Sequence, residues 1–381
     1  MPPVWKGLRY GSVSKGKDSE RLRTRRRHHG WLFSIPKWAI SGPSILHLTP
    51  TLRLCANRKP NSGTRLPSPR QFSVDFYAES CPHLDRIVAS VTTKQYKRAP
   101  AVAPATIRLF FHDCFVQGCD ASILIPSKEM AERDAEENKD LSQYAFDAIT
   151  EVKSAVETNC PASAVSCADI LAIAARDFVH LVGGPYYEVK KGRQDGNTSM
   201  ASRVQPNLPR ANSTLDQLLK LFSSKGLSLE DLVVLSGAHS IGFAHCKQFV
   251  SRLYNYSIKG TNNQTRHSST TMMDPRLLKA LRMSCPKFGG NADVMIPFDV
   301  KTPFVLDNAY YGNLEAKMGL LASDQVLFLD RRSRPLVQML AKDKKKFHAK
   351  FALAMEKMGS IGVERGKIHG VGRKDSATPT S

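Results

Sequence analysis

Long hydrophobic runs are missing from this sequence. Among its 381 residues no apolar stretch approaches the ~20 residues of a membrane-spanning helix, so we expect no transmembrane segment and no membrane partner. A secretory signal needs about 7–15 consecutive apolar residues, and Pro36, Lys37, Pro43 and His47 interrupt every candidate near the N-terminus. We therefore recognise no signal peptide in residues 1–70.

Acidic residues are scarce in the same region. Residues 1–70 contain fifteen lysines and arginines but only Asp18 and Glu20, a net charge of +13 that leaves +8 for residues 71–381. This basic segment has no sustained periodicity, and we expect a disordered extension or leader. The predicted organisation is an extension over 1–70, a folded domain over 71–375 and a short tail over 376–381.

The basic run RLRTRRRHHG (residues 21–30) raises the question of a nucleic-acid partner. Such a run can bind nucleic acid or act as a nuclear address. No recognisable binding module and no interleaved aromatic residues accompany it, so we expect no nucleic-acid partner. Its low acid content also suits an organelle transit peptide.

The folded part is predicted to be all-α. Strand patterns are few and short, whereas apolar residues recur at helical spacing. Helix start signals and helical patterns occur at Pro82–Val91, Tyr144–Val156, Ser166-x-x-Asp169, Ser228-x-x-Asp231, Asp274-Pro275 and Phe347–Met358. The apolar positions of the last stretch are interpreted as core packing rather than a cofactor site.

The stretch RLFFHDCFVQGCDAS (residues 108–122) concentrates chemically active side chains. Arg108 and His112 are four residues apart, so a helix places them on one side with Phe111 beside them. A cation and a proton shuttle then face one space. A single histidine of this kind is more often structural than catalytic, and it is the combination that favours catalysis.

Oxygen ligands recur in the same stretch. They are the side chains of Asp113, Asp120 and Ser122 and the backbone carbonyls of Val116 and Gly118. Hard oxygens suit Ca²⁺, but an EF-hand is excluded because Leu124 stands where that loop needs an acidic residue. A solvated turn is the alternative interpretation.

The eight cysteines include no C-x-x-C pair. A zinc site formed by His112, Cys114 and Cys119 would therefore lack the usual ligand spacing. Cys114 and Cys119 could instead close the short loop that carries the oxygens. The complete pairing cannot be chosen from the residues alone.

A second histidine follows a helix-capping signal in SLEDLVVLSGAHSIGFAHC (residues 228–246). Ser228 and Asp231 predict the start of a helix that carries His239 on its apolar face. Such a histidine is more often a core residue than a ligand. Two apolar helices that each present one histidine are nevertheless what a haem sandwich requires, because one histidine binds iron while the other side keeps a coordination site open.

Together these motifs resemble the secretory plant (class III) haem peroxidases. The resemblance spans roughly residues 71–375 and includes FYAESCP (76–82), VSCADILAIAARD (165–177), TPFVLDNAYYGNL (302–314) and GLLASDQVLF (319–328). It implies an all-α haem-peroxidase fold in which distal and proximal helical halves enclose one haem b, with minimal β-structure. It also implies a monomer.

The implied reaction oxidises two phenolic or similar aromatic donors with one hydrogen peroxide, giving two donor radicals and two water molecules. Its expected settings are oxidative stress, peroxide removal and the metabolism of lignin or other cell-wall phenolics. The alternative is a catalytically silent haem-fold protein that binds anionic wall polysaccharide, a partner that the positive charge permits. The presence of every expected haem-site residue favours the enzyme.

The resemblance assigns roles by position. In the haem site it assigns Arg108 and His112 as the distal acid–base pair, Phe111 as the distal aromatic, Asn138 as the acceptor behind His112, His239 as the iron ligand, Asp324 as its carboxylate partner and Pro209 as part of the donor entrance. It implies two Ca²⁺ sites: Asp113, Val116, Gly118, Asp120 and Ser122 with Glu132 in the outer shell, and Ser240, Asp299, Thr302, Val305 and Asp307.

The resemblance also implies the disulfides Cys81–Cys160, Cys114–Cys119 and Cys246–Cys285. Ser376 stands where the family has the partner of Cys167, so we expect Cys167 to be an unpaired thiol and Cys55 to be no substitute. Disulfides favour an oxidising compartment, as do the glycosylation sequons at Asn197, Asn212, Asn255 and Asn263. We expect a glycoprotein that is secreted to the cell wall or delivered to the vacuole.

Overall fold

The computed structural model describes residue 55 and residues 72–126, 130–254 and 273–363, all within the unit formed by residues 48–381. Three predictions therefore concern residues outside the described ones: the disorder of residues 1–70 (of which only Cys55 is described), the role of Ser376, and two of the four sequons. Of the other two sequons, Asn197 and Asn212 are both exposed.

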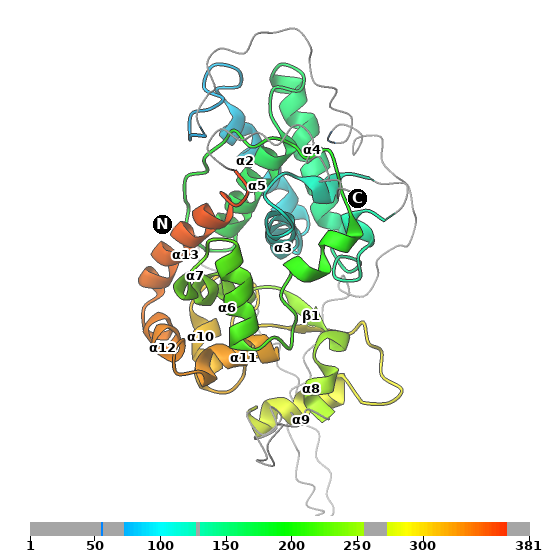
Figure 1. Cartoon of the computed structure of the whole chain (residues 1–381), viewed down its shortest axis with the longest axis vertical. Coiled ribbons are helices and arrows are strands. Elements are labelled where there is room, and N and C mark those ends of the chain that lie inside the picture. Colours follow the sequence, from blue (N-terminus) through cyan, green and yellow to red (C-terminus); the bar gives the residue numbers. More distant parts are fainter. Residues whose placement is uncertain (1–54, 56–71, 127–129, 255–272, 364–381) are drawn as a thin grey trace, which may run out of the picture. The chain divides into compact units, whose positions relative to one another are not determined.

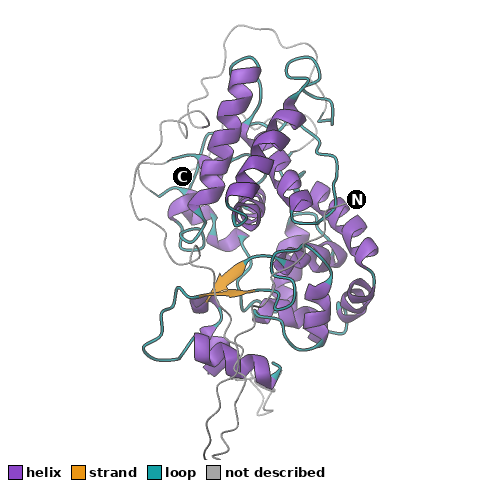
Figure 2. Cartoon of the chain, turned by 180° about the vertical axis from the view of Figure 1, so that it is seen from behind, coloured by secondary structure: helices purple, strands orange, loops and turns teal. Residues whose placement is uncertain are grey.

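The described residues are mostly helical, which confirms the all-α prediction (Figure 2). The helices are α2 (Leu84–Arg98), α3 (Val102–Phe115), α4 (Gln143–Asn159), α5 (Cys167–Leu181), α6 (Leu215–Ser224), α7 (Leu229–Ser236), α8 (Val250–Tyr254), α9 (Pro275–Ser284), α10 (Ala309–Glu315), α11 (Ala322–Leu329), α12 (Arg334–Lys342) and α13 (Lys344–Met358). Short 3₁₀ turns include η3 (Ser122–Leu124), η4 (Glu132–Asp134), η6 (Gln205–Asn207), η7 (Gly237–Ser240) and η8 (Cys246–Gln248). Strands β1 (Phe243–His245) and β2 (Met295–Pro297) pair antiparallel, with Ala244 opposite Ile296.

The helices pack in two groups (Figure 1). In the first, α2, α3 and α4 surround α5, whose residues from Cys167 to Val179 are all buried. In the second, α10 packs on α11 and α12, and α13 packs on α7 and α12. Helix α3 of the first group carries Arg108 and His112, while η7 of the second carries His239.

Several helices begin where the sequence predicts, because a side chain accepts the free N–H groups of the first turn. Ser166 accepts from the amide of Asp169 at the start of α5, and Ser228 forms a reciprocal capping box with Asp231 at the start of α7. Asp274 accepts from the amides of Arg276 and Leu277 at the start of α9. On α13 the buried residues recur at helical spacing, as predicted for core packing: Phe347, Phe351, Ala354, Met355 and Met358.

A buried ion pair joins the core of the first helical group to the end of α13. Arg193 Nη1 lies 2.8 Å from Asp169 Oδ1, and both side chains are almost wholly buried. The same guanidinium donates to the carbonyl of Gly359 from Nε and Nη2. Asp195 in turn accepts from the amides of Cys167 and Ala168. The segment 192–196 therefore has a structural role.

The disulfides confirm three expected pairings and correct one prediction. Cys81–Cys160, Cys114–Cys119 and Cys246–Cys285 form as the resemblance implies. The prediction of a free Cys167 is wrong, because Cys167 is bonded to Cys55 with their Cα atoms 5.9 Å apart. That prediction assumed that the N-terminal segment makes no contact with the domain. Cys55 is buried against the core and supplies the partner that we had sought in the C-terminal tail.

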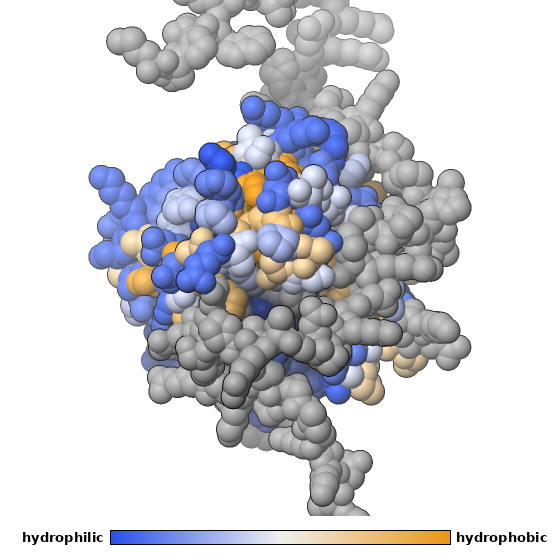
Figure 3. All heavy atoms as spheres, turned by 90° about the horizontal axis from the view of Figure 1, so that it is seen from above, coloured by the Kyte–Doolittle hydropathy of each residue, from blue (hydrophilic) through white to orange (hydrophobic). Residues whose placement is uncertain are grey.

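The described surface mixes mostly hydrophilic residues with small hydrophobic patches on the face seen from above (Figure 3). Within the described part of the chain, every helix is too short or too polar to span a bilayer. Two apolar clusters lie inside: a large one that runs through both helical groups, and a smaller one around α8, α9 and β1.

Candidate active site

The distal side of the site is built on α3. The spacing of four residues brings Arg108 and His112 together as predicted, and Arg108 Nε donates to His112 Nε2 over 3.2 Å. His112 Nδ1 lies 2.6 Å from Asn138 Oδ1, while Asn138 Nδ2 donates to the carbonyl of Glu132 over 2.7 Å. Because Nε2 accepts a hydrogen bond, the proton of neutral His112 sits on Nδ1. Asn138 thus fixes both the tautomer and the orientation of the imidazole.

Burial makes His112 a neutral base. The side chain is 6% exposed, and burial together with the positive charge of Arg108 lowers the pKa of His112 to about 3. The imidazole is therefore unprotonated at neutral pH, with Nε2 able to accept a proton. This is the protonation state that general-base chemistry needs.

Arg108 has a second partner that the sequence did not reveal. Its Nη2 lies 2.8 Å from Oδ1 of Asp140, and its Nη1 donates to the Asp140 carbonyl over 3.3 Å. Burial acts to raise the pKa of Asp140, but the attraction of Arg108 leaves that pKa below its usual value. Asp140 is therefore ionised and fixes the far end of the guanidinium. No spacing rule relates residue 140 to residue 108.

Of the other predicted distal residues, Phe111 adjoins His112 in the chain and Pro209 lies on a separate segment. Phe111 is half-buried, with its ring centroid 4.3 Å from that of Phe115 and edge-on to His112. Pro209 is half-buried in the segment between η6 and α6. The structure thus places Phe111 beside His112, as the helical spacing predicts.

His239 lies on a 3₁₀ turn rather than on the α-helix that we predicted. Helix α7 ends at Ser236, and η7 continues it through Gly237 to Ser240. A Cβ atom on Gly237 would lie 2.5 Å from the hydroxyl of Tyr311 and 2.6 Å from the ring of Phe347. Close packing at Gly237 therefore accompanies the change of helix type, and only glycine fits without a shift of its neighbours.

Asp324 fixes the orientation of His239. His239 Nδ1 lies 2.7 Å from Asp324 Oδ1, and the imidazole stacks on the ring of Phe298 at 4.2 Å. With Nδ1 bound to the carboxylate, Nε2 is the nitrogen that can bind a metal. A carboxylate behind a histidine ligand raises the basicity of the ligand. This geometry fits the role that the resemblance assigned to both residues.

Two further groups bind Asp324, which is 2% exposed. The backbone amide of Leu321 donates to Oδ2 over 3.1 Å, and the hydroxyl of Tyr310 donates to Oδ1 over 3.0 Å. Tyr310 lies on α10 and Asp324 on α11, so no helical spacing links them. The sequence motif contained Tyr310, but nothing in the pattern indicated this bond.

In the loop after α3, hydrogen bonds connect several of the groups predicted to bind Ca²⁺. Asp113 accepts from the amides of Ala121 and Ile123, and Ser122 Oγ donates to Glu132 over 3.3 Å. Burial, and then the negative charge of Asp120, raise the pKa of Asp113 well above its usual value. Carboxylates gathered in a buried, oxygen-rich loop are a donor set that fits a Ca²⁺ ion.

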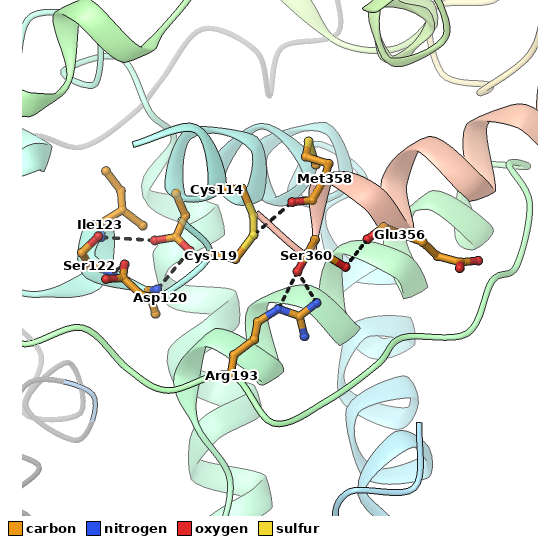
Figure 4. Close-up of a disulfide and its surroundings, with 12 residues drawn as sticks. Cys114, Cys119, Asp120, Ser122, Ile123, Arg193, Glu356, Met358 and Ser360 are labelled. Atoms are coloured by element: carbon orange, nitrogen blue, oxygen red, sulfur yellow. Dashed lines mark hydrogen bonds between the residues drawn. A yellow bond between two sulfur atoms is a disulfide. The ribbon is translucent and has the colours of Figure 1, made fainter. Parts of the chain in front are cut away.

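This loop is attached to the end of α13 (Figure 4). Cys114 and Cys119 are bonded to each other, which excludes the zinc site that we considered. The amide of Cys119 donates to the carbonyl of Ile361 over 3.0 Å. Gly362 has a φ of +77°, and a Cβ there would lie 2.7 Å from the Cα of Gly118. The two backbones can approach this closely only where side chains are absent.

The second set of oxygen ligands also comes together. Ser240 Oγ donates to the carbonyl of Val305 over 2.8 Å and accepts from the amide of Asp307. The Thr302 hydroxyl donates to Asp307 Oδ1 over 3.1 Å, and the Thr302 amide donates to Asp299 Oδ1. Asp299 is fully buried. This cluster starts at the residue after His239 and also fits Ca²⁺.

The chain is similar to known proteins over most of its length. A family model described as Peroxidase matches residues 88–343. The chain belongs to the class III plant haem peroxidases. It is 56% identical to Peroxidase 19 of Arabidopsis thaliana over 336 residues, which cover 87% of this chain and 95% of that protein. Peroxidase 55 of the same plant is 44% identical over 81% of this chain and 90% of its own length, and Peroxidase 41 is 42% identical over 80% and 90%.

Membership of this family fixes the general activity. The chain is a haem peroxidase, an oxidoreductase that uses hydrogen peroxide to oxidise donor molecules. Its family implies haem and, in general, calcium. The secretory relatives and the four disulfides of the described residues point to an extracellular location.

Proposed function

We propose that this enzyme oxidises phenolic and similar aromatic donors by one electron each, with one haem b and two Ca²⁺ ions bound. The observation that carries the proposal is the pair of fixed histidines: His112, whose Nε2 is an unprotonated acceptor, and His239, whose Nε2 is the nitrogen left to bind a metal. One hydrogen peroxide and two donors give two donor radicals and two water molecules. Bound haem would supply the iron that peroxide coordinates and the oxidising equivalents that the donors consume.

His112 moves the peroxide proton. Its Nε2 would accept the proton from one peroxide oxygen and return it to the other, which leaves as water when the O–O bond breaks. Bound haem would supply the two electrons for that cleavage. In the resting arrangement Nε2 accepts from Arg108 Nε, so an incoming peroxide must replace that hydrogen bond. The exchange frees the Arg108 Nε–H to stabilise the negative charge that develops on the departing oxygen.

His239 would hold the iron through Nε2, and Asp324 would accept from its Nδ1–H. The donor groups of the two oxygen clusters would each hold one Ca²⁺: Asp113, Val116, Gly118, Asp120 and Ser122 in the first, with Glu132 outside it, and Ser240, Asp299, Thr302, Val305 and Asp307 in the second. Pro209 would border the donor entrance. We propose that the enzyme acts as a monomer in the cell wall or vacuole, where its positive charge allows contact with anionic polysaccharide.

The test is reconstitution of the full chain with haemin and Ca²⁺ under oxidising conditions. We expect a Soret band and peroxide-dependent oxidation of a simple phenol such as guaiacol. The His112→Ala variant should keep the Soret band and lose most of the activity, whereas the exposed His180→Ala should match the wild type. A normal Soret band without phenol oxidation would instead support the catalytically silent protein.

A further inference from the structure

One carboxylate oxygen of Asp324 accepts hydrogen bonds from two side chains. Oδ1 accepts from His239 Nδ1 at 2.7 Å and from the Tyr310 hydroxyl at 3.0 Å. Oδ2 accepts from the amide of Leu321. The negative charge of Asp324 is therefore shared among three N–H or O–H groups, and the share that reaches His239 depends on the other two.

Tyr310 is buried beside His239, and its hydroxyl faces Asp324. The side chain is 2% exposed, and its ring packs edge-on to the imidazole of His239 with the centroids 6.4 Å apart. Because a carboxylate oxygen only accepts hydrogen bonds, the Tyr310 hydroxyl is the donor to Asp324 Oδ1.

Hydrogen bonds to a carboxylate oxygen lower its ability to attract another proton. A carboxylate that attracts the Nδ1 proton of a histidine ligand strongly gives the ligand imidazolate character, which stabilises ferric iron. A second hydrogen-bond donor to the same oxygen must weaken the attraction between the carboxylate and the Nδ1 proton. Tyr310 and Asp324 are each 2% exposed, so bulk water has little access to the oxygen that they share.

We propose that Tyr310 is a positioning residue that moderates the pull of Asp324 on the Nδ1 proton of His239 and so sets the electron donation of His239 to the haem iron. This inference rests on the proposed role of His239 as the iron ligand. The Tyr310 hydroxyl bonds to Asp324 and not to His239, so it acts on the iron ligand through the carboxylate.

The Tyr310→Phe variant removes the hydroxyl and keeps the ring. In the reconstituted holoprotein we expect a lower Fe(III)/Fe(II) midpoint potential and a higher Fe–His stretching frequency in the resonance Raman spectrum of the ferrous form. Both changes follow from a stronger proton acceptor behind His239. They are readouts of the iron ligand and not of turnover.

Tyr311→Phe is the matched control. Tyr311 is also fully buried and adjacent to Tyr310, but its hydroxyl donates to the carbonyls of Val233 and Val234. Its loss removes a comparable buried hydrogen bond without touching Asp324. The potential and the Raman band should then stay at their wild-type values.

A third variant tests the proposal even if Tyr310→Phe fails to fold. Genetic incorporation of 3-fluorotyrosine at position 310 keeps every contact and makes the phenol a stronger donor, so both readouts should shift in the direction opposite to that of Tyr310→Phe. Unchanged readouts in Tyr310→Phe, or equal shifts in Tyr310→Phe and Tyr311→Phe, would overturn the proposal. Absence of an Fe–His band in the wild type would instead refute the role of His239, and with it the proposed function.

Discussion

Arg108 and Asp140 form an ion pair, with Nη2 of the guanidinium 2.8 Å from Oδ1 of the carboxylate. The other end of the guanidinium donates to His112 through Nε. Asp140 therefore fixes the Nη2 end of the guanidinium, while Nε can exchange its hydrogen bond to His112 for one to a substrate oxygen. In this way Asp140 positions the catalytic cation.

Replacing Asp140 by Asn should slow the reaction with peroxide by about ten-fold, because a cation without its anchor spends less time in the productive position. The Arg108 side chain is 41% exposed, so the pair should contribute less than about 1 kcal/mol to the free energy of unfolding. Stopped-flow kinetics and thermal melting measure the two effects. Glu136→Gln, which breaks the exposed Lys139–Glu136 pair, is the control and should change neither. Equal peroxide rates in Asp140→Asn and the wild type would show that the pair has no catalytic role.

The sequence predicts what lies within one helix better than what lies between helices. Four-residue spacing placed Arg108 beside His112, and capping residues located the starts of α5, α7 and α9. The interactions of Asp140 with Arg108 and of Tyr310 with Asp324 were not predicted. In each case the partner lies on another element, so tertiary packing and not chain spacing sets the distance. The helix predicted through His239 changes to a 3₁₀ turn at Gly237, where packing against Tyr311 and Phe347 takes precedence over the local pattern.

The rate of reaction with peroxide should be nearly constant from pH 7 to about pH 5 and should fall as the pH approaches the His112 pKa of about 3. The pKa is lower in the folded protein than the usual value of about 6.5. The unfolded chain therefore binds a proton at His112 between these values that the folded protein does not. Stability from this group is complete above about pH 6.5 and declines as the pH falls toward 3.

Chemical denaturation across that range measures the effect on stability. In His112→Ala the contribution of this group disappears, so the stability should depend less steeply on pH than in the wild type. The same slope in both proteins would mean that His112 titrates normally when folded.

Breaking the Cys55–Cys167 bond by Cys55→Ser should lower the free energy of unfolding by about 2–5 kcal/mol, because the bond restricts the unfolded chain. Thiol titration in denaturant should find no free thiol in the wild type and one in the variant. Cys55→Ser/Cys167→Ser should be destabilised to a similar degree, which separates loss of the bond from effects of the new thiol. A wild-type protein that releases a thiol without reductant would contradict the pairing.

Removing Ca²⁺ with a strong chelator should lower the melting temperature and the peroxidase activity together. One proposed site directly follows His112 and the other directly follows His239, so each ion stabilises a segment that carries a catalytic histidine. Calorimetry and a phenol-oxidation assay, repeated after Ca²⁺ is added back, measure both effects and their reversal. A melting temperature and an activity that the chelator leaves unchanged would rule out a structural role for the ions.

The bond from Cys55 to Cys167 also bears on how the protein can be processed. A protease that cuts the chain between residues 56 and 71 would not release the N-terminal fragment, since its Cys55 stays covalently joined to α5. The nicked protein would migrate as one species on a non-reducing gel and as two after reduction. Only a cut that falls before residue 55 can shed the basic segment ahead of it while leaving Cys167 protected.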